Sequence, residues 1–278
     1  MASSPRTLLI TGCSSGIGYD AAIGMRDRGW RVFASCRNPE DCERMQRQGF
    51  ESPHIDYARP DSIATGLEDV LSATDGGLDA LFNNGAFGSP GAVEDMPTDG
   101  LREIFEANFF GWHELTRRVI PVMRAQGSGR IIQNSSVLGF VTLPWRGAYN
   151  ATKHALEGLT DTLRIELRDT GIHVVLIEPG PVTSRIGDNS VAQFERWIDW
   201  EASPRADEYR AELRKRLYTR RGRDPFELPA DAVTQKLIHA LEAFQPKPRY
   251  YVTTPTYFMG ISKRLLPTRA LDWLIQRI

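Results

Sequence analysis

A strand, a glycine-rich turn and a helix follow one another at the start of the chain, and this unit constrains the fold most. Thr7–Ile10 is a short apolar run typical of a buried strand, and residues 11–18 read Thr-Gly-Cys-Ser-Ser-Gly-Ile-Gly. Apolar residues at Ala21, Ala22 and Met25 then recur at helical spacing. Glycines let the backbone approach a ligand closely, and the first N–H groups of a helix attract an anion. This order of elements predicts a dinucleotide site, with a simple tight turn as the alternative.

The second predicted strand, residues 31–35, indicates which dinucleotide. In this kind of unit, an acid at the end of the second strand selects a free ribose 2′-hydroxyl, whereas Arg accommodates a 2′-phosphate. Here the strand runs into Cys36 and Arg37, and the next acid is Glu40. Arg37 therefore favours NADP(H) over NAD(H), and a solvated Arg at the start of a helix is the alternative.

Strands and helices alternate through most of the remaining chain. We expect further strands at residues 52–56, 78–82, 129–134, 172–177 and 249–252, and helices at 39–48, 61–73, 101–126, 148–169 and 229–243. Short connections between alternating elements are typical of a parallel sheet with helices on both faces. The prediction is an α/β protein with a Rossmann-type, doubly wound parallel sheet in three layers, and with residues 1–278 as a single domain.

Two segments near the C-terminus depart from this alternation. Residues 184–228 hold Trp197 and Trp200 before a basic run at 210–223, and we expect this segment to be a lid over a substrate site. Residues 258–278 predict an amphipathic C-terminal helix whose apolar residues are interleaved with Lys and Arg. Such a helix can lie on an anionic membrane surface. The alternative is a helix that packs on the sheet or on another subunit.

The composition argues against several classes of partner. A net charge of −1 gives no general attraction to nucleic acid, and the five His residues form no metal-ligand pair, so we expect neither nucleic acid nor metal. The three Cys residues, Cys13, Cys36 and Cys42, lack disulfide or zinc-finger spacing, which favours a reducing compartment. The N-terminus has no signal-peptide pattern, and no window is apolar enough to span a membrane. We therefore expect a cytoplasmic location.

Tyr149 and Lys153 are four residues apart in a predicted helix, and this spacing places them on one face. There the ammonium can favour the phenolate and lower the tyrosine pKa, which would make Tyr149 a general acid or base. Only five of the 34 Lys and Arg residues are Lys, and Lys153 is the first of them along the chain. A chain that otherwise prefers Arg has used the more compact donor here. The alternative is a surface Tyr beside a solvated Lys.

Together, these motifs resemble those of the short-chain dehydrogenase/reductase superfamily. Residues 11–18 match its Thr-Gly-x-x-x-Gly-x-Gly pattern, and residues 83–86, Asn-Asn-Gly-Ala, match its Asn-Asn-Ala-Gly motif with the last two residues inverted. Ser136 lies thirteen residues before Tyr149, a usual separation in the family. A Pro-Gly turn at 179–180 is followed by a Thr, as is typical of the family. The resemblance covers about residues 7–183.

The resemblance implies a set of catalytic residues: Asn108, Ser136, Tyr149 and Lys153. Tyr149 would pass the proton to or from the substrate oxygen, while Lys153 would lower the tyrosine pKa and hold the nicotinamide ribose. Ser136 would polarise the substrate oxygen. Asn108 would hold a water molecule that links Lys153 to solvent.

The resemblance also implies which residues bind the cofactor. Asp56 would accept a hydrogen bond from the adenine amine, and Thr183 would bind the carboxamide. The full set is Gly12, Ser14, Ser15, Gly16, Ile17, Gly18, Arg37, Asp56, Asn84, Gly85, Tyr149, Lys153, Pro179, Gly180, Val182 and Thr183.

Residues 11–18, with the Phe-Ala-Ser-Cys-Arg run at 33–37, look like the branch that contains 17β-hydroxysteroid and retinol dehydrogenases and many bacterial relatives. In that branch the Arg marks NADP(H) use. The resemblance implies hydride transfer between the nicotinamide and a bulky apolar alcohol or ketone. Aromatic and apolar residues between the catalytic Ser and Tyr, and in the predicted lid, would line the pocket: Phe140, Leu143, Trp145, Trp197 and Trp200.

The same motifs also occur in proteins with two other kinds of function. A family member with redox-neutral chemistry, such as an epimerase or dehydratase, is one alternative. A non-enzymatic NADP(H)-sensing protein is another, although such proteins usually lose the Tyr or the Lys. Family members commonly assemble through the helices predicted at 101–126 and 148–169, so we expect a homodimer or homotetramer.

Overall fold

A parallel β-sheet of six strands forms the centre of the computed structural model, which describes residues 5–219 and 226–277. The strands are β1 (Thr7–Ile10), β2 (Arg31–Ala34), β3 (Ala80–Asn83), β4 (Gly129–Asn134), β5 (Ile172–Glu178) and β6 (Arg249–Tyr251). Their order is β2-β1-β3-β4-β5-β6, and every neighbouring pair is parallel. The chain therefore starts inside the sheet and builds outward on both sides, which confirms the predicted doubly wound α/β fold.

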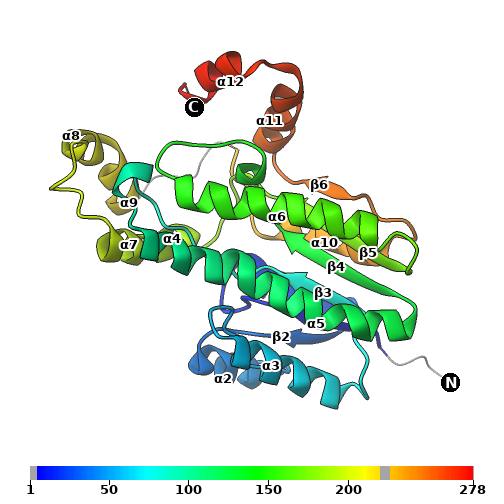
Figure 1. Cartoon of the computed structure of the whole chain (residues 1–278). Helices are drawn as coiled ribbons and strands as arrows, with labels where there is room; N and C mark the ends of the chain where they lie inside the picture. Colours follow the sequence, from blue (N-terminus) through cyan, green and yellow to red (C-terminus); the bar gives the residue numbers. More distant parts are fainter. Residues whose placement is uncertain (1–4, 220–225, 278) are drawn as a thin grey trace.

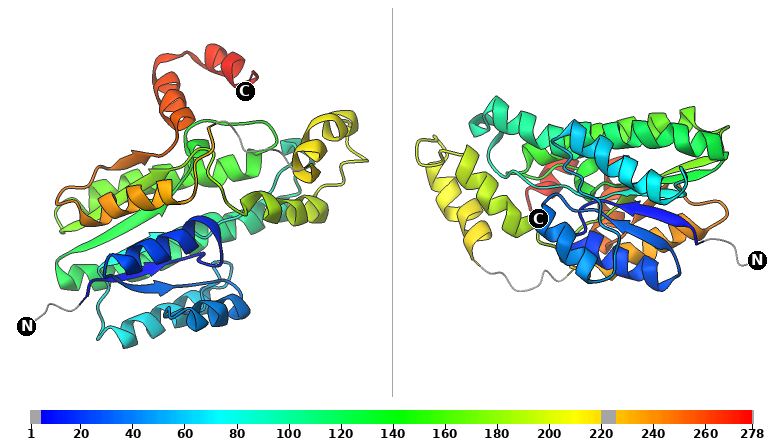
Figure 2. Two further views of the ribbon diagram at one scale, coloured as in Figure 1. Left: turned by 180° about the vertical axis from the view of Figure 1, so that it is seen from behind. Right: turned by 90° about the horizontal axis from the view of Figure 1, so that it is seen from below.

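Helices cover both faces of this sheet (Figures 1 and 2). On one face lie α1 (Gly16–Asp27), α2 (Pro39–Arg47) and α10 (Asp231–Glu242), and on the other α3 (Pro60–Ala73), α5 (Gly111–Gln126) and α6 (Gly147–Glu166). Successive strand residues point to opposite faces. Leu8 and Ile10 accordingly join the first apolar cluster, and Leu9 joins the second. These two clusters, one on each face, produce the predicted three layers.

The prediction of a continuous strand at residues 52–56 is wrong. The segment runs beside β2 and pairs with it only through isolated bridges. The N–H of Ala34 donates to the Glu51 carbonyl at 2.7 Å, but the next bond of a parallel ladder would need an N–H from Pro53, which has none. The Ser52 hydroxyl donates to the Ala34 carbonyl instead, at 2.6 Å. One proline at a pairing position therefore prevents a regular edge strand.

The helix predicted at 101–126 is interrupted by a π-helical turn. α4 (Thr98–Phe105) ends where the turn Glu106–Phe110 begins, and α5 continues from it. A π-helical turn inserts one residue into the helical spacing and is frequent at functional sites. This turn carries Asn108, whose side chain is fully buried.

The segment predicted as a lid is mainly helical. It contains α7 (Ile186–Trp197), α8 (Ala206–Glu208), a π-helical turn (Tyr209–Leu213) and α9 (Arg214–Tyr218). Phe194 and Tyr209 form an apolar cluster of their own with Ala92, which immediately precedes the 3₁₀ turn Val93–Asp95. Part of the predicted basic run falls on residues 220–225 and lies outside the described residues.

The single C-terminal helix predicted at 258–278 is in fact two helices, α11 (Thr254–Leu265) and α12 (Thr268–Ile275). Pro267 separates them because it has no N–H with which to continue a helix. α12 packs through Leu271 against Val141, in the segment after β4. Figure 1 shows both helices at one edge of the molecule, beyond β6. No helix in the described ranges is long and apolar enough to cross a membrane.

Candidate active site

The turn between β1 and α1 is packed so closely that side chains would not fit at its glycines. Gly12 and Gly16 have φ angles of 69° and 58°, in the left-handed region that favours glycine. A Cβ on Gly12 would lie 2.6 Å from the Cα of Gly85, and a Cβ on Gly18 would lie 2.3 Å from the Gly12 carbonyl oxygen. Glycine at these positions therefore lets the turn pack tightly at the start of α1, whose first N–H groups can bind a phosphate.

The Asn-Asn-Gly-Ala segment after β3 packs directly on this glycine turn. The Nδ2 of Asn84 donates to the Thr11 carbonyl at 3.0 Å, and its Oδ1 accepts from the Nδ2 of Asn134 at 2.8 Å. The carbonyl of Gly85 accepts a hydrogen bond of 2.8 Å from the indole N–H of Trp112. The inverted Gly and Ala thus still form a closely packed segment beside the predicted cofactor site.

Ser136, Tyr149 and Lys153 come together from two elements. Ser136 follows β4 and caps the 3₁₀ turn Val137–Gly139, where its Oγ accepts from the N–H of Leu138 at 3.1 Å. Tyr149 and Lys153 lie in the first turns of α6, with the lysine Nζ 5.7 Å from the centre of the tyrosine ring. The Ser136 hydroxyl acts to lower the pKa of Tyr149, and it donates a long hydrogen bond of 3.5 Å to the Pro179 carbonyl. These three predicted catalytic residues share one site.

The Lys153 side chain is 1% exposed and has two further neighbours. Its Nζ donates to the Asn134 carbonyl at 2.8 Å and lies 4.2 Å from the centre of the Trp112 ring. The face of an indole attracts a cation. Because the same indole bonds Gly85, Trp112 joins the lysine to the segment beside the glycine turn. Trp112 was not predicted from the sequence, because its place in a helix is equally typical of an ordinary core residue.

Burial dominates the protonation of both residues. It raises the pKa of Tyr149 to about 12, although Ser136 and Arg146 act in the lowering direction. Burial also lowers the pKa of Lys153 to about 7, although Glu157 acts in the raising direction. Lys153 is not among the groups that shift the tyrosine pKa in this arrangement, so its lowering effect on Tyr149 stays a prediction. Low-polarity surroundings favour the neutral form of each group.

Asn108 is placed beside this site but makes its hydrogen bonds elsewhere. Its Nδ2 donates to the Phe87 carbonyl at 2.8 Å, and its Oδ1 accepts from the Phe87 N–H at 3.1 Å. Phe87 and Tyr149 belong to the same apolar cluster. Asn108 therefore fixes the segment that packs against the tyrosine.

Arg37 and Asp56 lie near each other, at the ends of β2 and of the extended segment beside it. Arg37 is exposed, and its carbonyl oxygen lies 2.8 Å from the Nε2 of His54. The carboxylate of Asp56 accepts from the N–H of Ala58 at 3.1 Å. Both side chains are thus at the edge where the parallel strands end and where ligands of such sheets bind.

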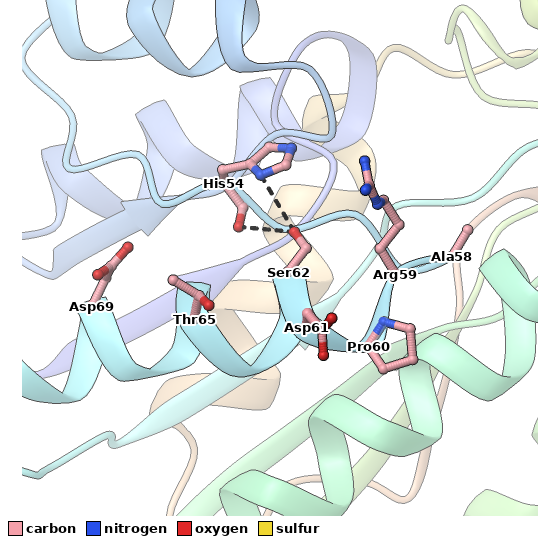
Figure 3. A pocket seen from close by; sticks show the side chains of 8 residues that line it. All are labelled: His54, Ala58, Arg59, Pro60, Asp61, Ser62, Thr65 and Asp69. Atoms are coloured by element: carbon pink, nitrogen blue, oxygen red, sulfur yellow. Dashed lines mark hydrogen bonds between the residues drawn. The ribbon is translucent and has the colours of Figure 1, made fainter.

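A cavity of about 510 Å³ lies beside this edge, at the start of α3, and contains none of the predicted site residues (Figure 3). Within it, Ser62 forms hydrogen bonds of 3.3 Å to both the ring and the carbonyl of His54. The lining residues are His54, Ala58, Arg59, Pro60, Asp61, Ser62, Thr65 and Asp69. Their side chains are largely polar, unlike the site expected for an apolar substrate.

The Pro-Gly turn after β5 closes the other side of the site. The carbonyl of Pro179 accepts from the N–H of Val137 at 2.8 Å, directly after Ser136. A Cβ on Gly180 would lie 2.1 Å from the Oγ1 of Thr253. The hydroxyl of Thr183 donates to Glu227 at 2.6 Å, and Val182 forms a bridge with Leu228, so the end of the lid segment anchors this turn.

The residues predicted to line the substrate pocket separate into two clusters. Phe140 and Leu143 pack with α12, whereas Trp145 packs on Tyr209 with ring centres 4.7 Å apart. Trp197 and Trp200 belong to the cluster of Trp145. The apolar surfaces beside Ser136 and Tyr149 therefore come from both the lid segment and the C-terminal helices.

A buried group of charges behind Lys153 was not predicted. Arg249 contacts Glu157, Glu178 at 2.6 Å and Asp161 at 2.5 Å. Glu178 is fully buried, and burial, reinforced by Glu157, raises its pKa to about 8. One oxygen of Glu157 and one of Glu178 lack a hydrogen-bond partner among the described residues. The one acid that ends an otherwise apolar strand at Glu178 was the available signal.

Comparison with known proteins places these features in a family. The short chain dehydrogenase family model matches residues 6–194. The chain is 40% identical over 272 residues to the uncharacterized oxidoreductase YbbO of Escherichia coli K12, covering 98% of this chain and 94% of that protein. It is 31% identical to the NADPH-dependent 3-dehydrocapnine reductase of Ornithobacterium rhinotracheale, covering 96% and 95%. It is 30% identical to human retinol dehydrogenase 8, covering 88% and 81%.

Solved structures agree with the sequence comparisons. A short-chain dehydrogenase from Streptomyces avermitilis superposes with a TM-score of 0.78 at 26% identity, covering 94% of this chain and 92% of that one. The chain therefore belongs to the short-chain dehydrogenase/reductase superfamily, is an oxidoreductase, and has relatives among the retinol and steroid dehydrogenases.

Proposed function

We propose that the chain is an NADP(H)-dependent oxidoreductase that interconverts a bulky apolar alcohol and the corresponding ketone or aldehyde. The observation that carries the proposal is the convergence of Ser136, Tyr149 and Lys153 in a fold that also holds a closely packed glycine turn before α1. Bound NADP(H) supplies or accepts the hydride. The chain's own residues then have to bind the cofactor, orient the substrate oxygen and move one proton.

Tyr149 moves that proton. Its raised pKa keeps the hydroxyl protonated at neutral pH, so that in the reducing direction it gives its proton to the substrate oxygen. Ser136 donates a hydrogen bond to the same oxygen and holds it in place. Lys153, held by Asn134 and Trp112, would hold the nicotinamide ribose of the bound cofactor. Asn108 supports the tyrosine side of the site through Phe87 and, when a water molecule is bound there, links Lys153 to solvent.

The packing of the two turns supports the predicted cofactor residues. The N–H groups at the start of α1 hold the phosphates, and exposed Arg37 pairs with the 2′-phosphate. Asp56 accepts from the adenine amine. Thr183 binds the carboxamide. The similarity to a reductase described as NADPH-dependent supports the same preference here.

An apolar substrate is supported by the surfaces that flank Ser136. Val141 and Leu143 pack with α12 on one side, and Trp145 packs with the lid segment on the other. The relationship to retinol dehydrogenase 8 points the same way. We also propose a homodimer or homotetramer formed through α5 and α6, where Ile165 is 56% exposed, and a cytoplasmic location, which suits three buried free cysteines.

The experiment is a reductase assay with purified protein, NADPH and a panel of apolar ketones, followed by loss of nicotinamide absorbance. Turnover is expected for the native protein, and Tyr149→Phe should lower it by about 10³-fold while NADPH still binds. Tyr19→Phe is the control, because the Tyr19 hydroxyl bonds Gln48 on the surface. Absence of turnover across the panel, or an active Tyr149→Phe protein, would refute the proposal.

A further inference from the structure

One side of α11 presents large apolar side chains to solvent. Tyr257, Phe258, Ile261 and Leu265 are between 49% and 75% exposed. Their spacing places them on a single face of the helix. Met259, on another side of the helix, is buried. Apart from Tyr257, whose ring centre lies 5.3 Å from that of Tyr251, the described residues leave this stripe largely exposed.

The helix that follows also exposes an aromatic side chain. Trp273 on α12 is 58% exposed, and the guanidinium of Arg277 lies 3.7 Å from the centre of its ring. Leu271 and Ile275 on the same helix are buried against the body of the protein. α12 thus has an inner face that holds it in place and an outer aromatic face.

The net charge of this segment is positive. Residues 254–277 contain four basic residues, Lys263, Arg264, Arg269 and Arg277, and one acid, Asp272, whereas the whole chain has a net charge of −1. All four basic residues are exposed. An exposed apolar stripe flanked by cations is the pattern of a helix that lies in the interface of an anionic bilayer.

We propose that α11 and α12 together form a docking surface for an anionic lipid bilayer. The apolar stripe would enter the boundary between headgroups and acyl chains, with the basic residues against the lipid phosphates. A second copy of this chain fits less well, because a two-fold contact through this face would bring two sets of four cations together. The two helices lie on the membrane without spanning it.

This surface is continuous with the catalytic site. The inner face of α12 packs on Val141 and Leu143, which follow Ser136 closely in the chain. A bilayer on the outer face would therefore lie one helix away from the segment that carries the catalytic serine. This step rests on the proposed apolar substrate: such a molecule would pass from the lipid to the site with little exposure to water.

Binding is tested by sedimentation of the full-length protein with phosphatidylcholine vesicles, with and without phosphatidylglycerol. The native protein is expected to sediment only with the anionic vesicles and to be released by high salt. The double variant Ile261→Asp, Leu265→Asp should weaken binding by on the order of tenfold or more. Phe244→Asp is the matched control: Phe244 is 90% exposed and precedes β6, at the opposite end of that strand from α11.

Several outcomes would overturn the proposal. It fails if the native protein does not sediment with anionic vesicles, or if the double variant binds them as strongly as the Phe244→Asp control does. It also fails if the native protein is an oligomer that does not bind vesicles and the double substitution breaks this oligomer into subunits. A second copy of the chain would then cover the apolar stripe.

Activity assays separate this proposal from the proposed function. With a water-soluble ketone, the double variant should turn over like the native protein. With an apolar ketone carried in anionic vesicles, the double variant should turn over more slowly than the native protein and the Phe244→Asp control. Binding without any turnover would leave the docking surface standing and refute the proposed reaction.

Discussion

Tyr149 and Lys153 share one face of α6, and the packing around the start of that helix removes both from water. Burial makes the tyrosine a weaker acid and the lysine a weaker base, so near pH 7 the tyrosine is neutral and the lysine is divided between its charged and neutral forms. A protonated phenol is the form required to reduce a carbonyl. Alcohol oxidation requires the phenolate, and this direction should gain with rising pH.

Arg37 is the residue on which cofactor choice depends. Replacing it by Asp removes a charge-assisted bond to the 2′-phosphate and adds a repulsive charge, so the preference for NADPH over NADH should fall by roughly 100-fold. The measurement is the ratio of kcat/KM for the two cofactors. Arg47→Asp is the control, since Arg47 is equally exposed but lies at the end of α2. An unaltered ratio in Arg37→Asp would mean that another group reads the phosphate.

Glu178 should make stability depend on pH. Its folded-state pKa is raised above the ordinary value of 4.5 to about 8, first by burial and then by Glu157. Its contribution is therefore complete below about pH 4.5 and is lost as the pH rises through about 8. Glu178→Gln keeps an acceptor for Arg249 but does not titrate. The free energy of unfolding of the native protein should thus fall relative to that of the variant between pH 5 and pH 8, measured by urea denaturation.

Asp161→Asn is the control for this measurement, because Asp161 binds the same arginine. Partial burial acts to raise its pKa, but Arg164 and Arg249 outweigh this and lower it. The stabilisation by Asp161 is lost only as the pH falls through the acid range. The difference in free energy of unfolding between the native protein and Asp161→Asn should therefore stay constant between pH 5 and pH 8. A pH-independent difference for Glu178→Gln would contradict the assigned protonation.

At the scale of elements, the apolar runs and the glycine turn predicted the sheet and its helices well. A local sequence pattern cannot show which hydrogen-bond acceptor a residue will face in the fold. The pattern at 52–56 therefore predicts a strand, although Pro53 faces the Ala34 carbonyl without an N–H to donate. The π-helical turn at Glu106–Phe110 depends on tertiary contacts of Asn108 with Phe87 and was equally hidden. Pro267 was different: the break before α12 was visible in the sequence and was overlooked.

The junction of the π-helical turn and α5 gives a prediction about packing. A Cβ on Gly111 would lie 2.4 Å from the Tyr57 carbonyl oxygen, and Tyr57 is held by hydrogen bonds to Thr11 and Asn83. Gly111→Ala should therefore destabilise the protein by about 1–3 kcal/mol, despite the better helix propensity of Ala. Chemical denaturation gives the value.

Gly158→Ala is the matched substitution in α6. A Cβ there would meet nothing within 4 Å, and the position is exposed. In the separate subunit, the change should stabilise the fold by up to about 1 kcal/mol through helix propensity alone. Equal effects of the two substitutions would show that α5 can move away from Tyr57 at little cost.

At the scale of the whole molecule, the proposed site is assembled from distant parts of the chain. The spacing between Ser136, Tyr149 and Lys153 was enough to predict that they share a site. Tyr149 and Lys153 lie on neighbouring turns of one helix, and Ser136 follows the end of one strand. Trp112 and the Arg249 group were not predictable in this way. They reach Lys153 or its surroundings only through the fold, from α5, β5 and β6.

The C-terminal helices are the last part to join the site, and their attachment can be tested directly. Leu271 is 6% exposed and seats α12 on the segment after Ser136. Leu271→Asp would place an unpaired charge in that contact and should release α12. The KM for an apolar ketone should then rise several-fold while the Kd of NADPH stays unchanged, because the predicted phosphate-binding residues of the glycine turn are not among the residues that α12 packs on. Trp273→Asp changes the outer face of the same helix and serves as control. If Leu271→Asp makes α12 sensitive to protease without changing the KM, the C-terminal helices do not shape the substrate site.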